Sequence, residues 1–155
     1  MRTIRAGALL LAGLAVGTAV PTAGAAQDDA EAVMVAAARW AQQRLPSGSL
    51  RIDPHRSGRA AEAAVLRVAN ALGADVGTLE ATRRCTDVMN PSTCSLDSVV
   101  LLAFAAPEIR GDEARVRVYA WYRQDSAREP VARESWDVVL RRSGSGWEVA
   151  GPSRR

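Results

Sequence analysis

Two cysteines are the residues with the clearest chemistry in this 155-residue sequence. Cys85 and Cys94 enclose a polar segment, CTDVMNPSTC, whose central Asn-Pro-Ser is typical of a turn. A disulfide, a metal site and a redox pair are the alternatives. A metal site needs more ligands than two thiols and one distant histidine, and a redox pair favours the spacing C-x-x-C. We therefore predict a structural disulfide, which over this loop would stabilise the fold by about 2.7 kcal/mol.

The single histidine, His55, is the residue best suited to acid–base catalysis near neutral pH. It stands in the segment IDPHR, a turn leading into a helix, where a surface position explains it without catalysis. The sequence contains no G-x-S-x-G elbow, no glycine-rich phosphate loop and no H-E-x-x-H motif. A Ser-His-Asp site assembled through space stays open. The sequence favours a non-enzymatic protein, and we assign no catalytic residue, no cofactor and no metal ligand.

A possible ligand-binding face lies in the last third of the chain, where residues 114–123 alternate strictly. If this face is concave, its cationic and aromatic groups would bind a small anion by charge-assisted hydrogen bonds and stacking. Glu134 or Asp137 on the neighbouring strand would then serve as general base if desolvation raised its pKa. We favour the alternative, a solvated sheet face with cross-strand Arg–acid pairs. The remaining residues of the candidate face are Arg115, Arg117, Trp121 and Arg123.

The first half of the chain predicts helices that would support these residues. One helix is expected from Asp28 to Leu45 and another from about Ser57 to Leu72, with Gly73 as its C-cap. A short strand is expected over Ser49–Asp53 and a short third helix over Val76–Arg84. Apolar residues at helical spacing form the buried faces of the two long helices: Val33, Ala37 and Trp40 in the first, and Ala61, Val65, Val68 and Leu72 in the second.

The last third of the chain predicts strands. Residues Ser98–Ala106 are apolar on both faces, as in a central strand, whereas residues 114–123 and 131–142 alternate. A Ser-Gly-Ser-Gly turn at 143–146 leads to a last short strand, and such short loops indicate an antiparallel meander. Helices followed by strands predict an α+β fold, with the N-terminal helices packed on one face of a four- to five-stranded antiparallel sheet.

The segment Asp97–Ala150 resembles the NTF2-like and cystatin-like superfold. The resemblance lies in DEARVRVYAWYRQ and in WDVVLRRSGSGWEVAG, a long strand, a glycine turn and a closing W-x-V strand. It implies a curved sheet that wraps partly around helices. Members of this group include isomerases, dehydratases and binding domains, so the resemblance implies an alternative function: a small-molecule-binding protein or pocket enzyme acting on an anionic or polar ligand.

The first 25 residues have the order typical of a secretory signal. Arg2 and Arg5 precede an apolar run, Ala6–Val20, and Ala23-Gly24-Ala25 is a small-x-small cleavage site. We predict cleavage after residue 25, which leaves one domain at 26–155. The alternative is a retained anchor, because the uncharged stretch is long enough to span a bilayer.

Charge argues against a nucleic-acid partner. Without Arg2 and Arg5 the chain has 18 basic residues, all arginine, against 17 acidic ones, a net charge of +1 with both signs interspersed. Because of the signal-like first 25 residues and the cysteine pair, we expect an exported domain, periplasmic or extracellular, without a stable membrane span after processing. Its expected function is that of a binding or envelope-interaction module whose partner is a protein or a small molecule.

Overall fold

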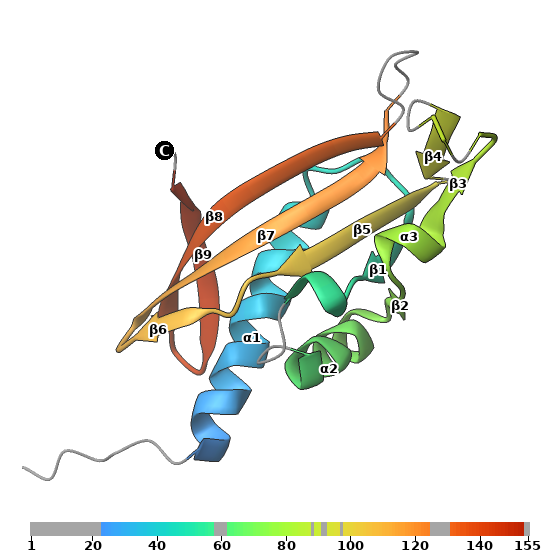
Figure 1. Ribbon diagram of the computed structural model, residues 1–155. Coiled ribbons are helices and arrows are strands. Elements are labelled where there is room, and N and C mark those ends of the chain that lie inside the picture. The colour runs from blue at the N-terminus through green and yellow to red at the C-terminus, as the bar shows by residue number, and fades with distance from the viewer. Residues whose placement is uncertain are drawn as a thin grey trace, which may run out of the picture.

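Helices precede most of the strands in the computed structural model, which describes residues 23–57, 62–87, 89–90, 93–96, 98–124 and 131–153 (Figure 1). The helices are α1 (Ala23–Gln42), α2 (Glu62–Leu72) and the four-residue α3 (Leu79–Thr82), with a 3-10 turn at His55–Ser57. The strands are β1 (Ser49–Ile52), β2 (Asp75–Val76), β3 (Arg83–Cys85), β4 (Cys94–Leu96), β5 (Val99–Phe104), β6 (Glu108–Arg110), β7 (Glu113–Arg123), β8 (Val131–Ser143) and β9 (Gly146–Ser153). The predicted α+β class is confirmed.

The main sheet has seven strands and is mixed, which corrects the predicted four to five antiparallel strands. Its order is β2-β1-β5-β7-β8-β9, with β6 also paired to β7. The predicted meander is present, since β5, β7, β8 and β9 pair antiparallel. However, β1 runs parallel to both β5 and β2. A parallel pair needs a long crossover, and here α2 and the β3–β4 hairpin lie between β1 and β5 in the chain.

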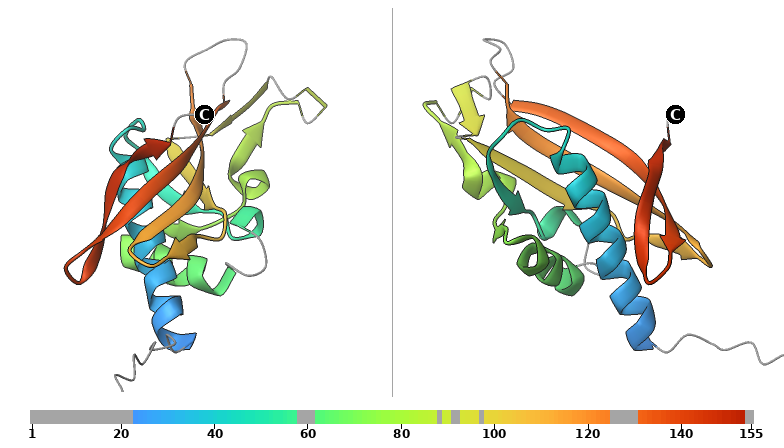
Figure 2. Two further views of the ribbon diagram at one scale, coloured as in Figure 1. Left: turned by 90° about the vertical axis from the view of Figure 1, so that its left-hand side faces the viewer. Right: turned by 180° about the vertical axis from the view of Figure 1, so that it is seen from behind.

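The main core lies between one face of this sheet and the helices α1 and α2. Val33 and Ala37 of α1 and Val65 and Val68 of α2 are fully buried, as predicted, and Trp40 packs against the same core. Figure 2 shows α1 crossing the sheet when the molecule is viewed from behind. Burying each large apolar side chain contributes about 1.5–3 kcal/mol, so this interface supplies much of the stability.

The predicted helix boundaries need three corrections. α1 begins at Ala23, five residues earlier than predicted, and ends at Gln42. α2 begins at Glu62, after the 3-10 turn, while the predicted core residue Ala61 lies outside the described residues. The segment predicted as a helix over 76–84 instead contains the end of β2, then α3 and β3. The helical part begins only after Thr78, whose side chain accepts a hydrogen bond from Ala81 N and caps α3.

The predicted C-cap of the second helix is confirmed. Gly73 follows α2 with φ +62°, a left-handed conformation that glycine adopts without strain. The N–H of Ala74 donates to the carbonyl of Ala69 at 2.9 Å and so closes the helix end.

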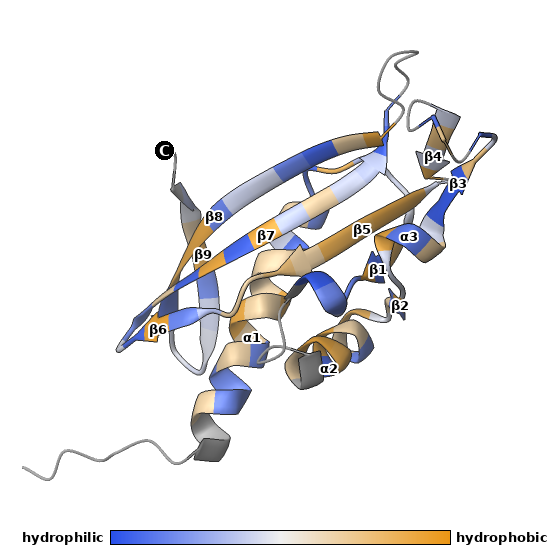
Figure 3. Ribbon diagram, in the orientation of Figure 1, coloured by the Kyte–Doolittle hydropathy of each residue, from blue (hydrophilic) through white to orange (hydrophobic). Residues whose placement is uncertain are grey.

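A second, smaller core lies on the other face of the sheet. α3 and the β3–β4 hairpin cover the central strands there, so not every helix packs on one face. Leu101 and Ala103 point into this core while the even-numbered residues of β5 point into the main one. β5 is consequently hydrophobic along its length (Figure 3), as predicted for a central strand. The remaining buried members of the second core are Leu79, Leu96 and Trp121.

Over the described part of the chain, none of the helices has the length and hydrophobicity needed to cross a bilayer. The predicted signal segment lies outside the described residues as far as residue 22.

Candidate functional site

The predicted ligand face is brought together only in part. Arg115, Arg117 and Asp137 line an open groove of about 360 Å³ on the sheet face opposite α1 and α2. Glu108 and the small side chains of Ala105 and Ala106 also line this groove.

The arginines of this groove are already paired with acids. Arg117 lies directly opposite Asp137 in the β7–β8 register and donates to it twice, from Nε at 2.6 Å and from Nη2 at 2.9 Å. The hydrogen bonds to the Asp137 carboxylate raise the pKa of Arg117 above its ordinary value. Arg115 donates to Glu113 at 3.1 Å. An anionic ligand would have to displace these carboxylates, so the geometry favours a solvated face with Arg–acid pairs.

Glu134, one of the two bases considered, lies on the opposite face from Asp137. It accepts a hydrogen bond from the Tyr122 hydroxyl, and this bond raises the pKa of Tyr122. Successive residues of a strand point to opposite faces, and 134 and 137 differ by an odd number. Glu134 and Arg117 therefore cannot act on one ligand.

Trp121 is on the same face as Arg117 but is buried. Trp121 is 5% exposed and belongs to the second core. The guanidinium of Arg56 lies 5.0 Å from its ring centroid. Arg133 lies 6.0 Å from the same centroid. Trp121 thus packs as a core residue, while Arg123, at the end of β7, is exposed.

Asp53, which the sequence did not single out, is a buried carboxylate at the end of β1. Its Oδ1 accepts hydrogen bonds from the N–H groups of His55 at 3.0 Å and Arg56 at 3.3 Å. Its Oδ2 accepts from the N–H of Leu79 at 3.0 Å and lies 3.6 Å from Arg56 Nε. Both oxygens are thus engaged in holding the segments that follow β1 and β2. His55 itself is exposed in the turn.

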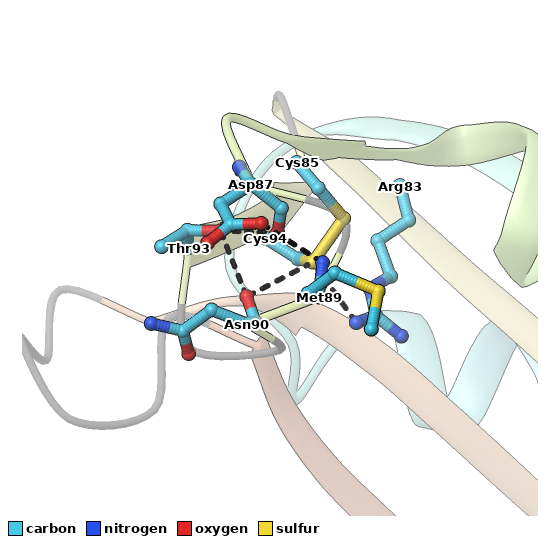
Figure 4. Close-up of a disulfide and its surroundings, with 7 residues drawn as sticks. All are labelled: Arg83, Cys85, Asp87, Met89, Asn90, Thr93 and Cys94. Atoms are coloured by element: carbon cyan, nitrogen blue, oxygen red, sulfur yellow. Dashed lines mark hydrogen bonds between the residues drawn. A yellow bond between two sulfur atoms is a disulfide. The ribbon is translucent and has the colours of Figure 1, made fainter.

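The predicted disulfide between Cys85 and Cys94 is confirmed. The two cysteines are directly opposite each other in the antiparallel β3–β4 pair, so the bond closes the hairpin at the base of its loop (Figure 4). The loop from Cys85 to Cys94 is called the disulfide loop below; its Val88, Pro91 and Ser92 lie outside the described residues.

Hydrogen bonds also connect the described residues of the disulfide loop. The N–H of Asp87 donates to the Thr93 hydroxyl at 3.0 Å, and this hydroxyl lies 2.8 Å from the carbonyl oxygens of Asp87 and Asn90. The Asp87 carboxylate accepts from the N–H of Met89 at 2.9 Å. Such local side-chain to backbone bonds are typical of ordered turns.

Met89 is the most exposed large hydrophobic residue that the structure describes. It is 90% exposed, against 46% for Leu66 and 47% for Val76. Met89, labelled in Figure 4, therefore presents an apolar side chain to solvent. The sequence pattern of the loop was interpreted only as a polar turn, although Val88 and Met89 are adjacent apolar residues within it.

An ion pair joins α1 to the β8–β9 hairpin. Arg142 donates to both carboxylate oxygens of Asp29, at 3.1 and 2.6 Å, and Trp147 Nε1 donates to Asp29 Oδ1 at 3.2 Å. The guanidinium of Arg142 also lies 4.5 Å from the Trp147 ring centroid. The hydrogen bond from Arg142 is the largest cause that lowers the pKa of Asp29 below its ordinary value of 3.8, and partial burial opposes it.

We expect Asp29→Asn to lower the free energy of unfolding by about 1 kcal/mol at neutral pH. Because the pKa of Asp29 is lowered in the folded chain, its contribution is complete above 3.8 and is lost as the pH falls through the folded value. Urea unfolding of both proteins across this range should show the difference closing at low pH. Asp28→Asn, at an exposed position in the same turn, is the control. A difference that persists in acid would contradict the assignment.

No family model, no curated protein and no solved structure matches this chain. Among the described residues, no three or more His, Cys, Asp or Glu side chains are grouped so that they could hold a metal ion. The resemblance to the NTF2-like superfold stays a prediction.

Proposed function

We propose that this protein is an exported, non-enzymatic binding domain that contacts a protein partner through its disulfide loop, with Met89 as the apolar anchor. The observation that carries the proposal is the 90% exposure of Met89 in a loop that the Cys85–Cys94 bond closes. Exposed side chains on rigidly held loops are a common place for binding function.

The energetics of such a contact support this assignment. Burying a methionine side chain that is almost fully exposed contributes about 1.5–3 kcal/mol to association. The disulfide closes the loop at its base, and the side chains of Asp87 and Thr93 bond to backbone groups of described residues, which reduces the conformational entropy lost on binding. The flexible thioether of methionine also adapts well to the shape of an apolar pocket.

Export is supported by the order of the first 25 residues and by the paired cysteines. Disulfides persist in oxidising compartments and are rare in the cytosol. Cleavage after Ala25 would shorten α1 by three residues but leave its ion pairs in place. These pairs begin at Asp29, which binds Arg142, and continue with Glu31, which accepts from Arg67 at 2.7 Å.

A protein partner is favoured over a small molecule held between helices and sheet. In an NTF2-like pocket protein this space is open, but here large side chains occupy it. Met34 from α1 and Phe104 and Val118 from the sheet are fully buried in the main core. The 360 Å³ groove beside Arg117 is the alternative small-molecule site, and its occupation by an anion would require the Arg117–Asp137 pair to open.

Site-specific cross-linking tests the proposal. A photoreactive residue placed at the exposed Asn90, in cells that make the protein, should give one discrete cross-linked protein, and the same residue at Leu66 on α2 should not. Met89→Asp in the Asn90-labelled chain should remove the product, and it should weaken binding of the purified partner at least tenfold. Identical products from both positions, or a product insensitive to Met89→Asp, would refute it.

A further inference from the structure

A cation lies against one sulfur of the disulfide. Nη2 of Arg83 is 2.9 Å from Cys94 Sγ (Figure 4). Arg83 and Cys85 are both on β3, two residues apart, so they lie on the same side of the hairpin, and Cys94 is opposite Cys85 on β4. The sulfur of Cys94 therefore has a positive charge at contact distance.

The two cysteines also differ in exposure. Cys94 is fully buried, whereas Cys85 is partly exposed. An attacking thiolate from solvent must approach one sulfur along the S–S axis and expel the other. The greater exposure of Cys85 favours attack at its sulfur, with Cys94 as the leaving group.

We propose that Cys85–Cys94 is a reactive disulfide that exchanges with an external dithiol. In the first step the external thiolate forms a bond to Cys85 Sγ while the Cys85–Cys94 bond breaks, and Cys94 leaves as a thiolate beside Arg83. In the second step the other thiol of the dithiol attacks its own sulfur in the mixed disulfide and releases Cys85. The two electrons and two protons of the dithiol end on Cys85 and Cys94, and the dithiol becomes a disulfide.

The surroundings of Cys94 favour this direction of cleavage. A thiol with a lower pKa leaves faster, and a neighbouring arginine lowers the pKa of a cysteine. Burial acts in the opposite sense, but a guanidinium in direct contact replaces the lost hydration of the thiolate. When Cys94 is instead protonated, the Asn90 carbonyl oxygen 3.9 Å away can accept its proton in a hydrogen bond. Glu80 is among the charged groups near Arg83, and its carboxylate already accepts a hydrogen bond from Arg56 at 3.0 Å.

The spacing argument against a redox pair does not hold once the chain is folded. A C-x-x-C pair is close in space because it is close in sequence, whereas here the hairpin register brings Cys85 and Cys94 together. The inference depends on the disulfide and Arg83 alone, and it is independent of any partner at Met89.

Reduction kinetics of the purified oxidised protein test the proposal. We expect Arg83→Gln to slow reduction by dithiothreitol about tenfold, followed as the appearance of alkylatable thiols. Arg84→Gln is the matched control: it removes the same charge from the neighbouring position, which faces the other side of β3, and should change the rate less than twofold. Equal rates for the two variants would overturn the proposal.

A second measurement does not depend on any variant's folding. Brief treatment of the wild-type protein with glutathione, quenching by acid and peptide fragmentation should place the mixed disulfide on Cys85 in preference to Cys94. A mixed disulfide mainly on Cys94 would overturn the assigned roles even if Arg83→Gln slows reduction.

Discussion

Asp53→Ala is expected to lower the free energy of unfolding by about 3–5 kcal/mol, because three backbone N–H groups lose their charged acceptor and each such loss costs about 1–3 kcal/mol. The Asp53 carboxylate accepts from three backbone N–H groups, those of His55, Arg56 and Leu79. Its loss would release the 3-10 turn after β1 and the start of α3 together. α3 covers Trp121, so the second core would loosen as well.

Asp75→Ala is the matched control for this substitution. Asp75 is also an aspartate beside the parallel strands β1 and β2, but its side chain is 75% exposed, and its carboxylate lies 3.9 Å from Arg51 Nε. Its removal should change the stability by less than about 0.5 kcal/mol. Urea unfolding of the three proteins measures both values. Equal and small effects would show that Asp53 does not hold the two segments.

Phe104→Ala is expected to cost about 3–5 kcal/mol and to leave a cavity between helices and sheet. Phe104 is fully buried at the end of β5 and is among the largest side chains of the main core. The cost includes both the lost transfer of the ring from water and the void that the surrounding residues cannot close. This result would show that the space expected of a pocket is filled by the protein's own packing.

Leu66→Ala provides the control for this second substitution. Leu66 is on α2 but 46% exposed, so its truncation should cost less than about 1 kcal/mol. Denaturant unfolding compares the two. If Phe104→Ala cost no more than Leu66→Ala, the interface would be loosely packed, and a ligand pocket between helices and sheet would again be the better interpretation.

Local patterns explain why the meander and the short strand β1 (Ser49–Ile52) were predictable, whereas the parallel pairing of β1 was not. The alternation of β7 and β8 and the glycine turn before β9 are each contained in a few neighbouring residues. In contrast, β1 pairs with β5 across a separation of 50 residues, Ser49 opposite Val99, and four alternating residues do not indicate direction. β2, with two residues, is too short to show any alternation.

The candidate site was predictable to a similar extent. Residue types and the expected export were enough to predict the Cys85–Cys94 bond. Strand parity, had it been applied, would have separated Glu134 from Asp137. The exposure of Met89 and the contact of Arg83 with Cys94 depend on the hairpin register and on side-chain packing, which no local pattern contains.

Export is the central claim, because the oxidised loop and its binding role both depend on the compartment. Mass spectrometry of the protein recovered from outside the cytoplasm of the cells that make it, with and without alkylation, tests it most directly. We predict a chain that begins at Ala26, takes up no alkylating reagent and gains two labels after reduction. A chain that retains Met1 and carries two free thiols would contradict the account.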